Sequence, residues 1–107
     1  MSQNWRQFLQ YESSKFPIMS SHTYYAPVLS TNSIVIDLGA STAAFSQAMA
    51  ELYGCKCYAA EATSHNINRI KETELISKFH YAIAGEISTL KLWIADDECH
   101  WGSIRPT

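Results

Sequence analysis

The stretch Ile34-Val-Ile-Asp-Leu-Gly-Ala-Ser-Thr-Ala43 decides the fold, together with Glu61 at the end of a second apolar run. Apolar and β-branched residues lead straight into Asp37 and Gly39, and a helical pattern starts a few residues later. The stretch therefore predicts a strand, a tight turn and the start of a helix. Nucleotide-like ligands bind at such junctions, because helix N-termini expose N–H groups and glycine lets the backbone come close.

The composition is that of a single globular domain. The chain has 107 residues, of which 47% are hydrophobic and 12% aromatic. A net charge of −2 argues against nucleic acid or an acidic membrane as partner, since both need clustered Lys and Arg. No apolar run approaches the roughly 20 residues that span a bilayer. The odd count of three cysteines, without a signal-peptide core, favours reduced thiols in a cytoplasmic protein.

The N-terminal third differs in pattern from the rest. Residues 3–16 predict an amphipathic helix, because Trp5, Phe8 and Leu9 recur at helical spacing. Residues 17–32 contain two prolines and many Ser and Thr, which predicts an irregular lead-in. We therefore divide the chain into an N-terminal helix and lead-in at 1–32 and an α/β domain at 33–107.

Strands and helices alternate in the second part. The pattern predicts strands at 33–37, 55–61 and 79–84, a helix at 43–53, and a second helix from residue 64. After a turn at 85–86, alternating apolar residues predict a hairpin strand over 90–94, with a loop from 96 to 107. For the 43–53 helix we expect Ser41 or Thr42 as N-cap and Gly54 as the stop. Its buried stripe is expected to be Phe45, Ala48, Met49 and Leu52.

This order of elements predicts the fold class. Strands that alternate with helices over short connections form a parallel sheet with right-handed crossovers. Apart from Lys56, the first two strands are apolar on both faces, as expected for strands with helices on each side. We expect a partial Rossmann-like, three-layer α/β fold with a mainly parallel sheet and a C-terminal hairpin.

The turn at 39–43 does not match a dinucleotide site. Such a site needs G-x-G-x-x-G, whose second glycine lets the backbone touch the pyrophosphate, and here Ser41 takes that position. The Asp37 carboxylate would repel phosphates but would accept hydrogen bonds from a cationic ligand. S-adenosylmethionine has no phosphate and carries an ammonium and a sulfonium. Glu61, which lies 24 residues after Asp37, is placed to accept both ribose hydroxyls.

The sequence resembles the FkbM family of class I S-adenosylmethionine-dependent methyltransferases. The resemblance rests on Val-Ile-Asp-Leu-Gly-Ala-Ser at 35–41, Tyr-Ala-Ala-Glu-Ala at 58–62 and Phe-His-Tyr-Ala-Ile-Ala-Gly at 79–85. It implies that the methionine end of the cofactor is lined by Asp37, Gly39, Ala40 and Ser41. It also implies that Glu61 holds the ribose and that Ala62 lies against the adenosine. Members of the family mostly methylate oxygen on sugars or small natural products, so a sugar or small metabolite is the implied acceptor.

The sequence departs from the family pattern at two positions and in length. Ala43 stands where the third motif glycine is usual, and Ser41 where Asn is usual. Class I methyltransferases use a seven-stranded sheet, and the family's next strand, with Asp-x-Glu-Gly, has no counterpart before Thr107. The ligand crevice of a doubly wound sheet lies at the switch point beside the first strand. The resemblance therefore implies a cofactor-binding half with one wall of that crevice.

Two other classes of function stay open. A non-catalytic α/β module would act through association, because the first strand leaves an unpaired edge rich in Ile and Val. We expect the chain to form a homodimer through that edge or to cover it with its N-terminal helix. An NAD-dependent oxidoreductase is disfavoured by Ser41 and Asp37.

No catalytic or metal-binding residue is assigned from the sequence. A general base for methyl transfer to a hydroxyl could be His80 or His100, but nothing places either beside an acceptor. Cys55 and Cys57 fall on one face of a strand, without the turn that paired zinc ligands use, which favours structural thiols. We expect no metal.

Overall fold

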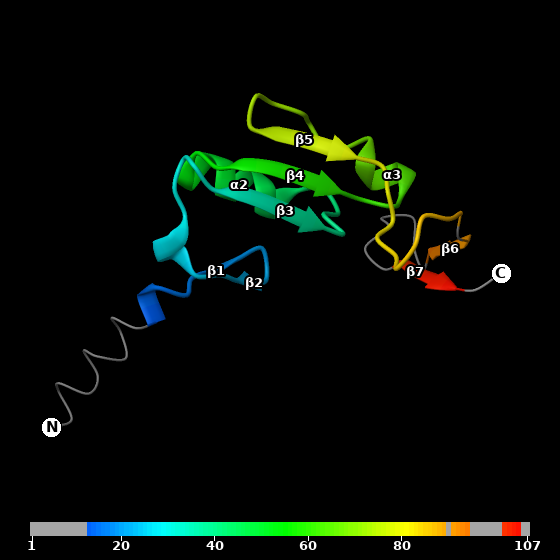
Figure 1. Ribbon diagram of the computed structural model, residues 1–107, viewed down its shortest axis with the longest axis horizontal. Helices are drawn as coiled ribbons and strands as arrows, with labels where there is room; N and C mark the ends of the chain where they lie inside the picture. The colour runs from blue at the N-terminus through cyan, green and yellow to red at the C-terminus, as the bar shows by residue number, and fades with distance from the viewer. Residues whose placement is uncertain (1–12, 90, 95–101, 106–107) are drawn as a thin grey trace, which may run out of the picture.

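A parallel three-stranded sheet organises the chain. The computed structural model describes residues 13–89, 91–94 and 102–105 (Figure 1). The strands lie in the order β3-β4-β5, and in register Ile36 pairs with Tyr58 and Tyr58 with Ser77. Parallel neighbours need crossover connections, and here these run through two helices. The bounds are β3 (Ile34–Leu38), β4 (Lys56–Ala60), β5 (Ile76–Phe79), α2 (Ala44–Tyr53) and α3 (Ser64–Ile67).

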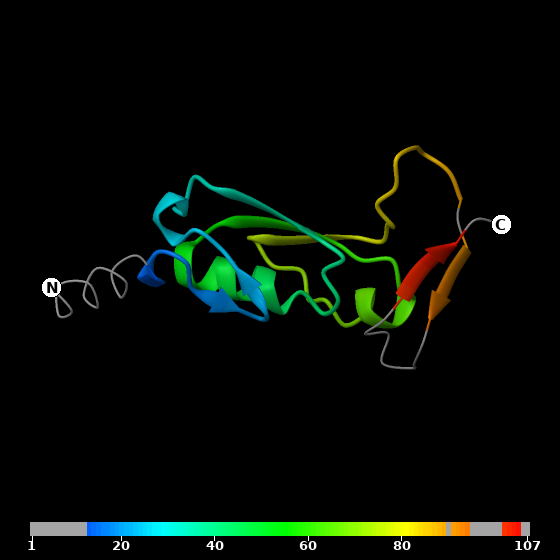
Figure 2. The ribbon, with the colours of Figure 1, turned by 90° about the horizontal axis from the view of Figure 1, so that it is seen from below.

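Both helices lie on one face of this sheet. Figure 2 shows α2 and α3 on the same side of β3, β4 and β5. Right-handed crossovers require this, because each new strand is added in the same direction across the sheet. Within the described residues the opposite face carries no helix. The α/β class and the parallel sheet are confirmed, and the part of the chain described contains two layers rather than the three expected.

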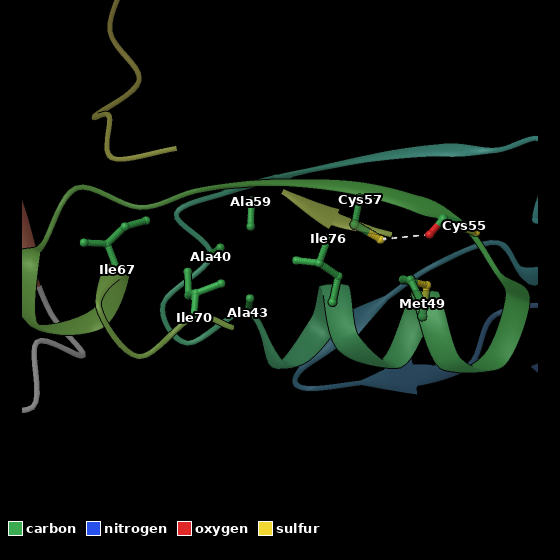
Figure 3. Packing of buried hydrophobic residues seen from close by; sticks show 9 residues of the cluster. All are labelled: Ala40, Ala43, Met49, Cys55, Cys57, Ala59, Ile67, Ile70 and Ile76. Atoms are coloured by element: carbon green, nitrogen blue, oxygen red, sulfur yellow. Dashed lines mark hydrogen bonds between the residues drawn. The ribbon is translucent and has the colours of Figure 1, made fainter. Parts of the chain in front are cut away.

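The core lies between α2 and the sheet (Figure 3). Small side chains such as Ala43 and Ala59, both 0% exposed, let the helix lie close to the strands. Met49 fills the larger space, as an unbranched and flexible side chain can. Cys55 and Cys57 are buried free thiols, as expected for structural cysteines. The cluster comprises Ala40, Ala43, Met49, Cys55, Cys57, Ala59, Ile67, Ile70 and Ile76.

Helix α2 differs from the sequence prediction at its start and on its buried face. Its N-cap is Ala43 in a left-handed conformation, with no side-chain cap, so neither Ser41 nor Thr42 caps it. Gly54 ends the helix at φ +69°, as predicted. The prediction was also wrong for Leu52, which is 56% exposed. Ser46, together with Met49, is the residue of α2 that is buried against the sheet.

The lead-in contains a hairpin that the sequence pattern did not predict. Strands β1 (Ile18–Met19) and β2 (His22–Thr23) pair through a turn in which Ser20 and Ser21 both have positive φ. Such a turn is usually signalled by Asn or Gly, so two serines gave little warning. The 3₁₀ turn η1 (Ala26–Val28) follows. The helix predicted at 3–16 lies mostly outside the described residues.

The Tyr24 side chain, just after this hairpin, holds the lead-in against α2. Its ring packs edge-on against Phe45 and Tyr53, and its hydroxyl lies 2.8 Å from the Tyr53 hydroxyl.

The third strand begins earlier than predicted and is followed by an irregular segment. β5 covers Ile76–Phe79 instead of 79–84, because Ile76 supplies the buried position opposite α2. Residues 80–89 form no helix or strand. The expected hairpin is present as a separate antiparallel pair, β6 (Lys91–Ile94) with β7 (Gly102–Arg105), so the expected loop over 96–107 is wrong at β7. No helix among the described residues has the length and apolar character needed to cross a membrane.

Candidate functional site

The turn that leaves β3 has an unusual backbone. Gly39, Ser41 and Ala43 all have positive φ, at +70°, +55° and +63°. A left-handed conformation costs a residue with a Cβ about 1–2 kcal/mol, so contacts must hold Ser41 and Ala43 in this shape. One such contact is the Ala40 N–H, which donates to the Ala60 carbonyl oxygen at 2.9 Å. The turn is therefore tied to the last residue of β4.

The Glu61 carboxylate makes the second tie. Its Oε1 accepts a hydrogen bond from the Ser41 N–H at 2.8 Å. Its Oε2 accepts from the Thr63 N–H at 2.9 Å and from the Thr63 hydroxyl at 2.8 Å. Glu61 is only 7% exposed. This one carboxylate thus joins the turn after β3 to the turn after β4 and fixes the distance between them.

Asp37 points to the helix side of the sheet. Its Oδ2 accepts a hydrogen bond from the Ser46 hydroxyl at 2.8 Å, and both side chains are buried. This hydrogen bond anchors the first turn of α2 to the end of β3.

Burial raises the pKa of the neighbouring Cys57 thiol to about 11, with further contributions from Cys55 and from the Asp37 charge.

The structure brings most of the sequence-derived site together. Asp37, Gly39 and Ser41 lie at the carboxyl end of β3, with Glu61 at the carboxyl end of β4, and Ser41 and Glu61 are in direct contact. Ala40, which precedes Ser41, is buried. The carboxyl ends of neighbouring parallel strands meet at one edge, which is where ligands of open α/β sheets bind.

Ala62, the residue after Glu61, lines an open hollow beside the junction. The hollow has a volume of about 830 Å³ and is lined by Ala62, His80, Tyr81 and the loop that follows. An His80 ring nitrogen lies 3.0 Å from the Ala62 carbonyl oxygen, which joins the ends of β4 and β5. The hollow thus begins one residue beyond Glu61 and extends under the segment 80–89.

Sequence reasoning missed two residues of this arrangement. Thr63 gives two of the hydrogen bonds to Glu61, and Ser46 gives one to Asp37. Their sequence signals are short: a threonine two places after a strand-end acid, and a serine within an apolar helix stripe. Both residues hold an acid in place and neither is exposed.

The other candidates do not join the site. His22 packs on Phe45, and His65, on α3, lies 3.5 Å from the exposed Arg69 guanidinium. His100 lies outside the described residues. In the part of the chain that the structure covers, no three His, Cys, Asp or Glu side chains are grouped to hold a metal ion.

The fold and site together define an α/β protein with a polar, hydrogen-bonded junction at the carboxyl ends of two parallel strands. Comparison of the chain with protein-family models, curated proteins and solved structures finds no match. The geometry of this junction is therefore the basis on which a function is proposed below.

Proposed function

We propose that this junction binds S-adenosylmethionine and that the chain is the cofactor-binding half of a Rossmann-like, class I methyltransferase similar to the FkbM family. The observation that carries the proposal is the hydrogen bond between the Ser41 N–H and Glu61 Oε1. It holds the turn suited to the methionine end and the acid suited to the ribose in one rigid unit. Such preorganisation reduces the entropy cost of ordering loops around a ligand.

The methionine end would lie along the 39–43 turn. A Cβ added to Gly39 would meet no atom within 4 Å, so the space beside this residue is open to a ligand. Asp37 provides negative charge two residues earlier, which favours an ammonium or sulfonium over a phosphate. This choice of charge is the reason that S-adenosylmethionine is preferred to NAD.

The ribose and adenine would follow the path from Glu61 to Ala62. A carboxylate offers about four acceptor positions, and three of those on Glu61 are used by Ser41 and Thr63. One position, on Oε1, would remain for a ribose hydroxyl, so Glu61 would hold one of the two ribose hydroxyls rather than both. Beyond it, the hollow beside Ala62, His80 and Tyr81 has apolar and aromatic walls suited to a planar base.

The reaction of the whole enzyme would transfer a methyl group in line from sulfonium to an oxygen nucleophile of a sugar or small metabolite. The C–O bond would form as the S–C bond breaks, an unassigned general base would take the hydroxyl proton, and S-adenosylhomocysteine would leave. Positioning of the two reactants is the main contribution a protein makes here, and it is worth about 7–11 kcal/mol in favourable cases.

The buried free thiols Cys55 and Cys57 suit the cytoplasm as the compartment.

Calorimetric titration with S-adenosylmethionine and S-adenosylhomocysteine tests the proposal. We expect both to bind and NAD not to bind. Glu61→Gln should weaken binding about 10-fold or more, since one hydrogen bond to a charged group contributes about 1.5–3 kcal/mol. Glu51→Gln, an exposed acid on α2, is the matched control and should bind as the wild type does. Absence of binding by the folded wild type would refute the proposal.

A non-catalytic module remains the second candidate. The observation in its favour is the exposure of Ile34, Ile36 and Leu38 along β3, at 66%, 67% and 56%. A row of exposed aliphatic side chains favours an interaction surface. A folded chain that binds neither nucleoside but associates through β3 would support this reading.

A further inference from the structure

Strand β3 has an open edge as well as an exposed apolar face. Among the described residues its only hydrogen-bonded neighbour in the sheet is β4. The side chains of Ile34, Ile36 and Leu38 alternate along the strand with that of Asp37, which accepts a hydrogen bond from Ser46 on α2. They therefore lie on the face opposite α2, and they are more than half exposed. An edge strand with such a face pairs readily with another strand unless charge, proline or a bulge prevents it. The sequence Ile-Val-Ile-Asp-Leu contains no proline and no lysine, and its one charged residue, Asp37, is turned to the helix face.

The direction of the backbone groups on β3 can be assigned. The Lys56 N–H of β4 donates to the Ser33 carbonyl oxygen. In a parallel ladder, alternate residues of a strand turn both N–H and C=O to the same neighbour. The odd-numbered residues of β3 therefore face β4, and Ile34, Ile36 and Leu38 turn their N–H and C=O groups to the open edge. The groups that need partners belong to the same residues that carry the exposed apolar side chains.

We propose that two copies of this chain pair antiparallel through β3, with Ile36 opposite Ile36 of the second copy. In this register Ile34 lies opposite the second copy's Leu38, and Leu38 opposite its Ile34. All three are hydrogen-bonded pairs, so every outward N–H and C=O of the strand finds an acceptor or donor. The result is one six-stranded sheet with two-fold symmetry through Ile36.

The symmetry of β3 favours a second copy as the occupant. On the open face the register places aliphatic side chains opposite aliphatic side chains, and each such cross-strand pair contributes about 0.2–1 kcal/mol. On the helix face Val35 lies opposite Asp37 of the second copy, so the two carboxylates are not opposed. Lys56, which lies beside Ile34 in register, already donates to Ser77 Oγ at 2.9 Å. No like charges meet along the joined edge.

A parallel pairing of the two β3 strands is excluded by geometry. A two-fold axis along the strands would place Ile36 opposite Ile36 with both residues turned toward each other. A parallel ladder instead needs each outward-turned residue to lie opposite one that is turned away. The same axis would also put α2 of the two copies on opposite faces. Only the antiparallel arrangement satisfies both the hydrogen bonds and the symmetry.

The pairing is tested separately from the proposed function. In a Rossmann-like enzyme the next strand would lie at this same edge of β3, so a chain that carries such a strand would not pair through it. Antiparallel strands run in opposite directions, so the two Ser41–Glu61 junctions lie at opposite ends of the six-stranded sheet. The hydrogen bonds of the pairing are made by Ile34, Ile36 and Leu38 and by none of the junction residues, so failure of ligand binding would not count against it.

The mass of the protein in solution is the first test. Light scattering during gel filtration should give twice the 12.1 kDa mass of the chain at micromolar concentrations. Ile36→Lys places two ammonium groups side by side on the two-fold axis and should give the monomer mass. Ile87→Lys changes a fully exposed isoleucine on the 80–89 segment and is the matched control, which should stay dimeric. A wild-type monomer, or a dimer that survives Ile36→Lys in a folded protein, would overturn the proposal.

Engineered cysteines test the register itself. Cys99, the third native cysteine, is first replaced by serine, so that Cys55 and Cys57, both buried, are the native thiols that remain. Ile36→Cys should oxidise to a disulfide-linked dimer, because opposed Cα atoms of a hydrogen-bonded pair lie about 5.5 Å apart and disulfides form at about 4.4–6.8 Å. Ile34→Cys alone should not cross-link, since the two copies of this residue would lie roughly 13 Å apart along the strands. Mixing Ile34→Cys with Leu38→Cys should give the mixed dimer. Cross-linking of Ile34→Cys to itself would show a face-to-face or shifted dimer and refute the register.

Discussion

Removal of the Glu61 side chain should destabilise the fold even when no ligand is present. The carboxylate is 7% exposed and accepts three hydrogen bonds, two of them from backbone N–H groups of Ser41 and Thr63. In Glu61→Ala these two donors lose their acceptor, and a buried donor left unsatisfied costs about 1–3 kcal/mol. The two donors together give an expected loss of about 2–6 kcal/mol, without any cost for the Thr63 hydroxyl. This is a large share of the roughly 5–15 kcal/mol that stabilises a typical domain.

Urea denaturation followed by far-ultraviolet circular dichroism measures this loss. Glu61→Gln should fall between Glu61→Ala and the wild type, because one side-chain oxygen can still accept from Thr63 while the amide group opposes the Ser41 N–H. Glu51→Gln, on the exposed side of α2, should change the free energy of unfolding by less than about 0.5 kcal/mol. Hydrogen exchange at the Ser41 amide should accelerate in both Glu61 variants. A change below about 0.5 kcal/mol in Glu61→Ala would refute the view that this carboxylate joins the two turns.

Three further outcomes are expected. The hydrogen bond with Tyr53 is the main reason that the pKa of Tyr24 is raised from 10.0 to about 12. The stability that this pair contributes is therefore complete below pH 10 and is lost as the pH rises to 12. Tyrosinate absorbance should show this late-titrating tyrosine, and Tyr53→Phe should return its pKa toward 10. Burial raises the pKa of Cys57 to about 11, so this thiol should resist alkylation at neutral pH in the folded protein and react in urea, and equal reaction rates would contradict its buried position. Ser41, at φ +55°, should accept Asn with little change in stability, whereas Ser41→Val should lower the free energy of unfolding by about 1–3 kcal/mol in the same urea assay.

The sequence predicted those parts of the fold where local pattern and tertiary structure agree. The run 34–38, the Gly54 stop of α2 and the order of the parallel strands follow directly from apolar periodicity and from a residue free to adopt positive φ. The junction at Asp37, Gly39, Ser41 and Glu61 was predicted for the same reason, since each follows the end of an apolar run. Strand ends in a parallel sheet meet at one edge, so their sequence positions are enough to group them.

The remaining features depend on contacts that no local pattern encodes. Ser41 and Ala43 adopt left-handed conformations because Glu61 and Ala60 hold the turn from a neighbouring strand, which removes the capping role predicted for Ser41. The β1–β2 hairpin forms against α2 through Tyr24, although its serine turn has no glycine or asparagine. Ile36 is exposed although the strand is apolar on both faces, because such a run of residues cannot distinguish a face covered by helices from one left open.

The strictly sequential order of the sheet also determines how the chain can fold. Ile36 pairs with Tyr58, and Tyr58 with Ser77, so each strand finds its partner only one helical connection further along the chain. Each pairing closes over a single helical connection, and the pairings can form in order as the chain leaves the ribosome. The unit β3-α2-β4 therefore leaves the ribosome before β5 does. The open edge of β3 is then already present on the emerging chain before β5 has joined the other side of the sheet.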